Sequence, residues 1–286
     1  MLAKGPIGLV VTALAIIPHI FLTSNYKAIF TWKVFLIPII IIVVLSPMLL
    51  GLHQQFGMHG IRFYFWEQSF GRITGENVWQ NDATKFYFLH NIAWAFIPYT
   101  FFLIAALIQS IFNFKNLKEY ISFFGVILPF IALSFSHYKL PHYIYIIIPF
   151  TAIITANFIQ KWLNKNENTA TDYFLMAMQS IVIMALLILP YALLYAFSAN
   201  ILLYIFLVVA QISVILYLFK QKDVKAKILY SSMLFFIISV AILNGFAYPN
   251  LLKYQSSSQV AFYINKHKIA KENLFQKNIY FRAFHY

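Results

Sequence analysis

Long apolar segments recur along this chain, and they limit its fold more than any other feature. We predict eight of them, because each could cross about 30 Å of hydrocarbon at about 1.5 Å per residue. They are residues 5–22, 34–52, 86–112, 119–136, 141–160, 174–197, 200–219 and 228–247. The composition agrees, since 62% of the residues are hydrophobic and 10% are charged, far from a soluble domain. We therefore predict an all-α polytopic membrane protein with about eight transmembrane helices.

The predicted segments carry no Asp, Glu, Lys or Arg near their middles. Ion-coupled transporters usually keep an ionisable group at that depth, so the pattern favours chemistry at the membrane surface. The polar residues that do lie inside are typical of hydrogen bonds between helices. They are His19, Asn91, Gln109, Asn157, Gln179, Gln211 and Asn244.

The lysines predict an orientation, because cytoplasmic loops carry an excess of Lys and Arg. Ten lysines follow the first, third, fifth and seventh segments: Lys27, Lys33, Lys115, Lys118, Lys161, Lys165, Lys220, Lys222, Lys225 and Lys227. The opposite, outer face holds Lys4, Arg62, Arg72, Lys85 and Lys139. The net charge of +13 is then explained by topology and lipid headgroups. No nucleic-acid-binding motif appears, so we expect no nucleic-acid partner.

This topology predicts two regions. Residues 1–247 would form the transmembrane region, with a long outer loop at residues 53–85. Residues 248–286 would begin a soluble outer α/β domain, with a helix over Ser256–Phe275 and a strand over Asn278–Tyr286. The N-terminus would lie outside with nothing to carry it across, and we therefore expect the chain to be part of a longer protein.

The outer loop carries the first candidate site. Arg72 follows Gly71 within WEQSFGRITGE, and a guanidinium with small neighbours can bind a phosphate through two nitrogens. The alternative is a headgroup-facing Arg72 paired with Glu67 or Glu76. The rings at residues 63–70 predict an interfacial helix that lies on the bilayer.

The turn Ser136-His137-Tyr138-Lys139-Leu140-Pro141-His142-Tyr143 carries the second candidate site. Pro141 suits a first helical turn, so we expect outward-facing backbone N–H groups beside Lys139, an arrangement that binds anions. Tyr143 adds a hydroxyl. The alternative is a lysine that extends to the membrane surface beside interfacial rings.

Histidines gather on the predicted outer face, near Glu67 in the sequence. They are His53, His59, His137 and His142. Together with Glu67 they could ligate a divalent metal, although no tightly spaced motif such as HExxH occurs. Interfacial hydrogen bonding is the alternative role for these histidines.

Three stretches resemble one family. SHYKLPHYIYIIIPFTAII is similar to the K-L-P-x-Y-x-x-P-x-x-P segment of the aminoarabinose-transferase-like glycosyltransferases, which share the GT-C class with protein O-mannosyltransferases. FYFWEQSFGRITGEN with FLHNIAWAFIPYTFF resembles the outer loop and next span of that family. YPNLLKYQSSSQVAFYI resembles the start of the outer domain in its Bacteroidetes-type members.

The resemblance implies a GT-C-like fold and a membrane glycosyltransferase. Such an enzyme moves a sugar from a polyprenyl-phosphate donor to lipid A, a protein or a glycan, on the periplasmic face of the bacterial inner membrane. It also implies that Arg72, Lys139 and Tyr143 contact the lipid phosphate. The catalytic carboxylate of the family matches no residue here, so we expect it in a missing N-terminal part and expect this fragment alone to be inactive. Glu67, His53, His59 and His142 stay candidates for contact with substrate or metal.

Two other functions stay open. A flippase or permease for a lipid-linked sugar would share the basic, ring-lined outer face, but it should carry polar residues through the bilayer. A non-catalytic membrane subunit would lend its lipid-phosphate site to a separate catalytic chain.

Overall fold

The computed structural model describes residues 6–71, 84–117, 119–254 and 256–269, in which helices are joined by short turns and no strand occurs. The chain divides into two compact units, Met1–Leu175 and Met176–Tyr286. The helix predicted to begin at Ser256 is confirmed as α12 (Ser256–Lys266), which ends earlier than predicted. The strand predicted for Asn278–Tyr286 lies outside the described residues, and the boundary predicted at residue 247 stays a prediction.

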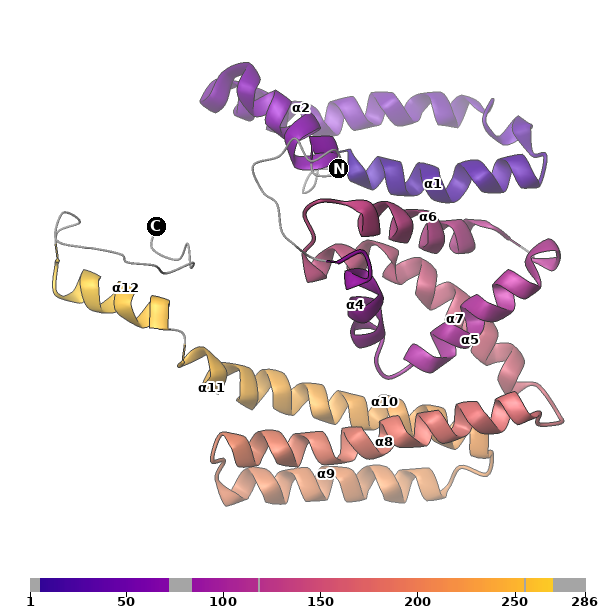
Figure 1. Cartoon of the computed structure of the whole chain (residues 1–286), viewed down its shortest axis with the longest axis vertical. Coiled ribbons are helices and arrows are strands. Elements are labelled where there is room, and N and C mark those ends of the chain that lie inside the picture. The colour runs from indigo at the N-terminus through magenta and orange to yellow at the C-terminus, as the bar shows by residue number, and fades with distance from the viewer. Residues whose placement is uncertain (1–5, 72–83, 118, 255, 270–286) are drawn as a thin grey trace. The chain divides into compact units, whose positions relative to one another are not determined.

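The first unit is a stack of apolar helices (Figure 1). Its segments are α1 (Ile7–Leu22), η1 (Tyr26–Ala28), α2 (Trp32–Arg62), η2 (Phe63–Phe70), α4 (Tyr87–Ala95), α5 (Thr100–Phe112), η3 (Phe114–Asn116), α6 (Ile121–Phe135), η4 (Pro141–Ile147) and α7 (Ile148–Leu163). Helix α1 packs along α6, α6 packs along α7, and α7 packs along α5. His19 of α1 supports the first of these contacts, because its Nδ1 accepts a hydrogen bond of 3.3 Å from the backbone N–H of Tyr120.

The predicted outer loop begins as a helix. Helix α2 continues through residues 53–62, where we predicted a loop, and the π-helix η2 extends it to Phe70. Gly57 kinks α2 with a φ of 61°, a conformation that glycine adopts without steric cost. The helix predicted over residues 63–70 is therefore confirmed as a helix, and its position on the bilayer surface stays a prediction.

The predicted span at residues 86–112 is broken. Helices α4 and α5 meet at an angle of 119° across a short break. Pro98 lies in this break, and proline both lacks an N–H for the helix ladder and disfavours helical backbone in the preceding residue. This segment is therefore a bent pair and not one straight helix.

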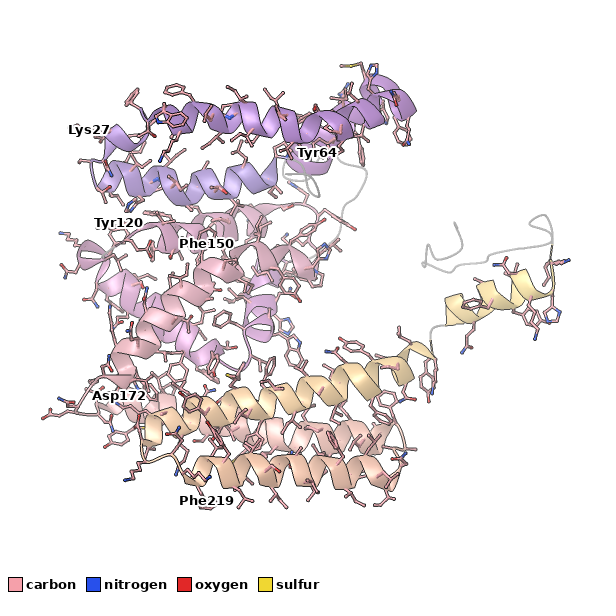
Figure 2. All side chains as sticks on the ribbon, turned by 180° about the vertical axis from the view of Figure 1, so that it is seen from behind. Lys27, Tyr64, Tyr120, Phe150, Asp172 and Phe219 are labelled. Atoms are coloured by element: carbon pink, nitrogen blue, oxygen red, sulfur yellow. The ribbon has the colours of Figure 1, made fainter. Side chains whose placement is uncertain are left out.

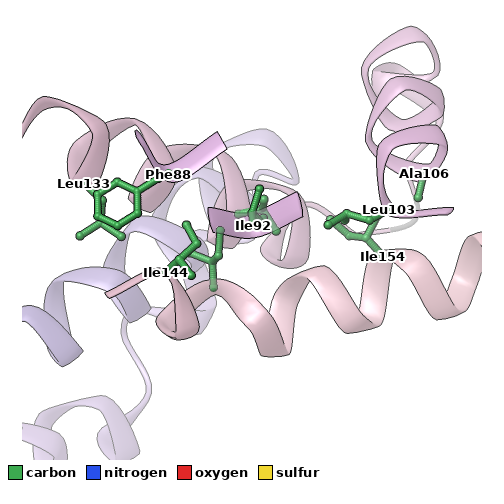
Figure 3. Close-up of a cluster of buried hydrophobic side chains, with 9 residues drawn as sticks. Phe88, Ile92, Leu103, Ala106, Leu133, Ile144 and Ile154 are labelled. Carbon is green, nitrogen blue, oxygen red and sulfur yellow. The ribbon is translucent and has the colours of Figure 1, made fainter. Parts of the chain in front are cut away.

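The core of the first unit lies where α4, α6, η4 and α7 meet. Phe88, Leu133 and Ile144 are buried together in this cluster (Figure 3). Helices α6 and α7 approach closely at Gly125, where an added Cβ would lie 2.6 Å from ring atoms of Phe150. A small residue at this position permits the close packing that is typical of membrane helices.

The second unit contains the rest of α8 (Ala170–Ala196), with α9 (Ile201–Phe219) and α10 (Val224–Ile242). Helix α10 continues through the π-helix η5 (Leu243–Ala247) into α11 (Tyr248–Leu252). The three long helices are antiparallel neighbours, and Leu194, Leu207 and Ile242 pack together at one end.

Hydrogen bonds between side chains cross the interior of the second unit. Gln179 donates to the hydroxyl of Ser232 at 2.7 Å, and Gln211 accepts from the hydroxyl of Tyr191 at 2.9 Å. Ser239 donates to a carbonyl of α8 at 2.9 Å. These contacts confirm the predicted interhelical role of Gln179 and Gln211.

Several helices are long and apolar enough to cross a bilayer. Within the described residues there are five, or six if the bent pair counts as one span: Trp32–Glu67, Pro141–Leu163, Ala170–Ala196, Ile201–Phe219 and Val224–Leu252. Helices α1 and α6 have only 16 and 15 residues, or about 24 and 22 Å, against about 30 Å of hydrocarbon. The described residues are therefore all-helical, with five or six helices that could span a membrane, as expected of a membrane protein, and the count of eight spans stays a prediction.

Candidate anion-binding site

A sharp bend after α6 positions the residues of the candidate site. Helix α6 ends at Phe135, and the hydroxyl of Ser136 then donates a hydrogen bond of 3.0 Å to the carbonyl of Tyr138. This local bond holds the chain in a tight turn before Pro141 opens η4. Lys139 lies within this bend, between α6 and η4, and is buried there.

Lys139 is buried, with only 5% of its surface exposed. Burial lowers the pKa of its ammonium group, and the charge of the nearby Lys85 lowers the pKa further. A charged group taken out of water is costly unless an opposite charge or hydrogen bonds stabilise it. An anion beside Lys139 and Lys85 would reduce this cost further.

Lys85 contributes the second positive charge. It precedes α4 and is exposed, and its Nζ lies 5.2 Å from the centre of the Phe135 ring. A cation over an aromatic face is attracted by the ring's electrons, so Phe135 holds the Lys85 side chain towards the end of α6. We call Lys85 and Lys139 the cation pair.

Tyr143 lies in the first turn of η4, four residues after Lys139 in the chain. It is partly buried against the apolar core, and its ring meets that of His142 edge to face with the centres 4.8 Å apart. The backbone N–H of Tyr143 donates to the carbonyl of Leu140 at 3.1 Å. The predicted row of outward backbone N–H groups is therefore wrong at Tyr143, because this turn is a 3-10 helix that uses that amide internally.

The structure does not assemble every predicted site residue. His53 and His59 are exposed on α2, on either side of the kink at Gly57, and Glu67 is half-buried in η2. Arg72 lies outside the described residues. No group of three His, Cys, Asp or Glu side chains able to hold a metal occurs in the part of the chain that the structure describes, so the suggested metal site stays a prediction.

Different residues meet at the two ends of α6. Lys85, Phe135 and Lys139 lie at one end, whereas His19 and Tyr120 meet at the other. The residues before α6 and those after it therefore lie at opposite ends of this helix, as they would if α6 crossed the unit from one side to the other. The compartment that each end faces stays a prediction from the lysine distribution.

Sequence reasoning missed Lys85 as a site residue. The only signal was its position directly before the apolar segment that begins at Phe86. Its contact with Phe135 depends on the packing of α4 against α6, which no local pattern predicts.

The chain matches no protein-family model, no curated protein and no solved structure. The assignment of a function therefore depends on the chemistry of the site.

Proposed function

We propose that this chain binds a polyprenyl-phosphate sugar donor at the cation pair and takes part in glycosyl transfer to an acceptor lipid, protein or glycan. In this proposal the fold is GT-C-like, and the site faces the periplasm from the bacterial inner membrane. The phosphate lies against Lys139 and Lys85, and the prenyl chain lies among the apolar helices of the bilayer region.

The observation that carries the proposal is the burial of Lys139 beside a second lysine. Two like charges close together disfavour each other, and burial makes the charged form of Lys139 costlier still. A phosphate at this point would offset both effects. It would also accept charge-assisted hydrogen bonds, which are stronger than bonds between neutral groups.

Such a site suits the leaving group of glycosyl transfer. When the bond between the anomeric carbon and the donor phosphate breaks, negative charge develops on the phosphate oxygens. Fixed positive groups placed at that point stabilise the charge as it forms. We propose the hydroxyl of Tyr143 and the guanidinium of Arg72 as further phosphate contacts.

The general base that would activate the acceptor is not assigned to any residue of this chain. Glu67, His53, His59 and His142 stay proposals for contact with substrate or metal. The polar residues inside the second unit bond to neighbouring helices, so they do not favour a transport path, and we place the flippase second.

The test uses the protein in lipid nanodiscs with a short prenyl monophosphate, and the prenol of the same length as the control ligand. We expect the phosphate to bind and to raise the thermal stability, and the prenol to do neither. A Lys139→Met variant should lose the effect. Lys161→Met, an exposed lysine in the last turns of α7, should keep it.

A second measurement follows the release of free polyprenyl phosphate from radiolabelled polyprenyl-phosphate sugars, which does not require the acceptor to be known beforehand. Release that depends on Lys139 supports the enzyme. Binding without release in membranes that hold the acceptor would favour the non-catalytic subunit. Equal binding of phosphate and prenol would refute the proposed site altogether.

A further inference from the structure

The turn between α9 and α10 carries an unusual density of positive charge. Lys220, Lys222, Lys225 and Lys227 fall within eight residues, with Asp223 as their one acidic neighbour. Lys220 and Lys222 are exposed and Lys227 is partly exposed, whereas Lys225 is buried. The exposed charge of this turn is therefore positive, because the carboxylate of Asp223 offsets only one of these three lysines.

Asp223 is occupied by its own helix. It is the N-cap of α10, and its two carboxylate oxygens accept from the backbone N–H groups of Lys225 at 3.0 Å and Ala226 at 3.3 Å. Capping of this kind uses the carboxylate to satisfy amides at the start of a helix. Among the described residues, no carboxylate forms an ion pair with Lys220 or Lys222.

The position of the turn along α9 sets its depth in a bilayer. Helix α9 has 19 residues, which is about 28 Å and close to the thickness of the hydrocarbon core. When α9 spans the membrane, its last residue therefore lies at the level of the headgroups.

Aromatic side chains near the turn agree with that depth. Tyr217 and Phe219 are exposed at the end of α9, where Phe219 is labelled in Figure 2, and Tyr230 is exposed on α10. Phe219 has 74% of its surface exposed. Tyrosines are enriched at membrane–water interfaces, where the ring lies at the level of the headgroups.

We propose that the α9–α10 turn is a binding site for the headgroups of anionic phospholipids, formed by Lys220, Lys222 and Lys227. The lysines supply the charge, and the exposed rings hold the turn at the depth where headgroup phosphates lie. Clusters of basic residues next to a membrane span attract anionic lipids in this way. The proposal depends on the second unit alone and is independent of glycosyl transfer.

The test follows which lipid contacts the turn. The chain has no cysteine, so Gln221→Cys accepts a single fluorophore beside Lys220 and Lys222. The labelled protein is placed in phosphatidylcholine nanodiscs with a small fraction of spin-labelled phosphatidylglycerol or spin-labelled phosphatidylcholine. We expect the anionic lipid to quench several-fold more strongly than the neutral one.

Two controls isolate the lysines. A fluorophore at Ser198→Cys reports the exposed α8–α9 turn of the same unit, which has no lysine, and should show equal quenching by both lipids. In the Gln221→Cys protein, each Lys→Gln change at 220, 222 or 227 should weaken the preference by up to about fivefold, since each lysine near the surface contributes about 1 kcal/mol.

Either of two results would overturn the proposal. One is equal quenching by the two lipids in the parent protein, which would mean that the lysines set orientation only or bind an acidic protein. The other is a preference that persists in the K220Q/K222Q/K227Q variant. Should that triple variant not fold, K220Q and K222Q are tested separately, because both side chains are exposed, and an unchanged preference in both would overturn the proposal.

Discussion

The two lysines of the cation pair should contribute very unequally to phosphate binding, because one is buried and the other is exposed. Lys139 has 5% of its surface exposed, and hydrogen bonds to charged groups contribute about 1.5–3 kcal/mol. Lys139→Met should therefore weaken binding of a prenyl monophosphate by about 10- to 150-fold. Lys85→Met should weaken it by about 1.4- to 5-fold, since exposed ion pairs contribute about 0.2–1 kcal/mol.

The pH dependence follows from the pKa of Lys139, which burial and then the charge of Lys85 lower. Between this lowered pKa and the ordinary value near 10.4, the unfolded chain binds more protons at this residue than the folded chain does. The free energy of unfolding of the ligand-free protein should therefore rise with pH through that window. Phosphate binds the protonated form, so its stabilising effect should decrease as pH rises through the lowered pKa.

Isothermal titration in nanodiscs measures the affinities, and thermal unfolding with and without ligand measures the pH dependence. Lys139→Arg is the matched variant, because arginine stays charged over the whole range, and any binding it keeps should not fall with pH. A larger loss for Lys85→Met than for Lys139→Met would refute the reasoning. So would ligand stabilisation that stays constant up to pH 10.5.

Further predictions concern the packing that supports these sites. Gly125→Ala should lower the stability by about 1–3 kcal/mol, because its Cβ would overlap Phe150 in a well-packed core; Phe150→Leu should restore part of this loss in thermal unfolding. Ser232→Ala removes the acceptor for Gln179 and should cost about 0.6–1.7 kcal/mol in detergent titration. Asp223→Ala removes the N-cap of α10 and should cost about 0.5–2 kcal/mol, while the preference of the α9–α10 turn for anionic lipid increases.

The helices of the second unit could be predicted to within a few residues. The segments predicted at 174–197, 200–219 and 228–247 correspond to α8, α9 and α10. They are long and uniformly apolar, and in a bilayer such a segment satisfies its backbone hydrogen bonds only as a helix. Their partners were less predictable, because a pair such as Gln179 and Ser232 depends on the register between helices.

The first unit departs from prediction where the sequence is less uniform. The polar residues from His53 onward suggested a loop, but helix α2 continues through them. The non-helical backbone is confined to Gly57, and the chain is helical on both sides of it. Hydropathy at residues 86–112 suggested one span, but Pro98 falls in a break within it. The site role of Lys139 stays a prediction from its motif. The contact of Lys85 with Phe135 could not be predicted, because that ring comes from α6.

Salt should separate the two proposed anion-binding sites, since they differ in exposure. At 0.15 M salt the screening length is about 8 Å, and exposed charges are screened much more than buried ones. The lipid preference at Lys220 and Lys222 should therefore decrease steeply between 0.05 and 0.5 M salt, expected as a several-fold change in the quenching ratio. Prenyl phosphate binding at the buried Lys139 should change less over the same range. If both signals decreased together, the phosphate would be held by the exposed charge of Lys85, and the burial of Lys139 would not explain the site.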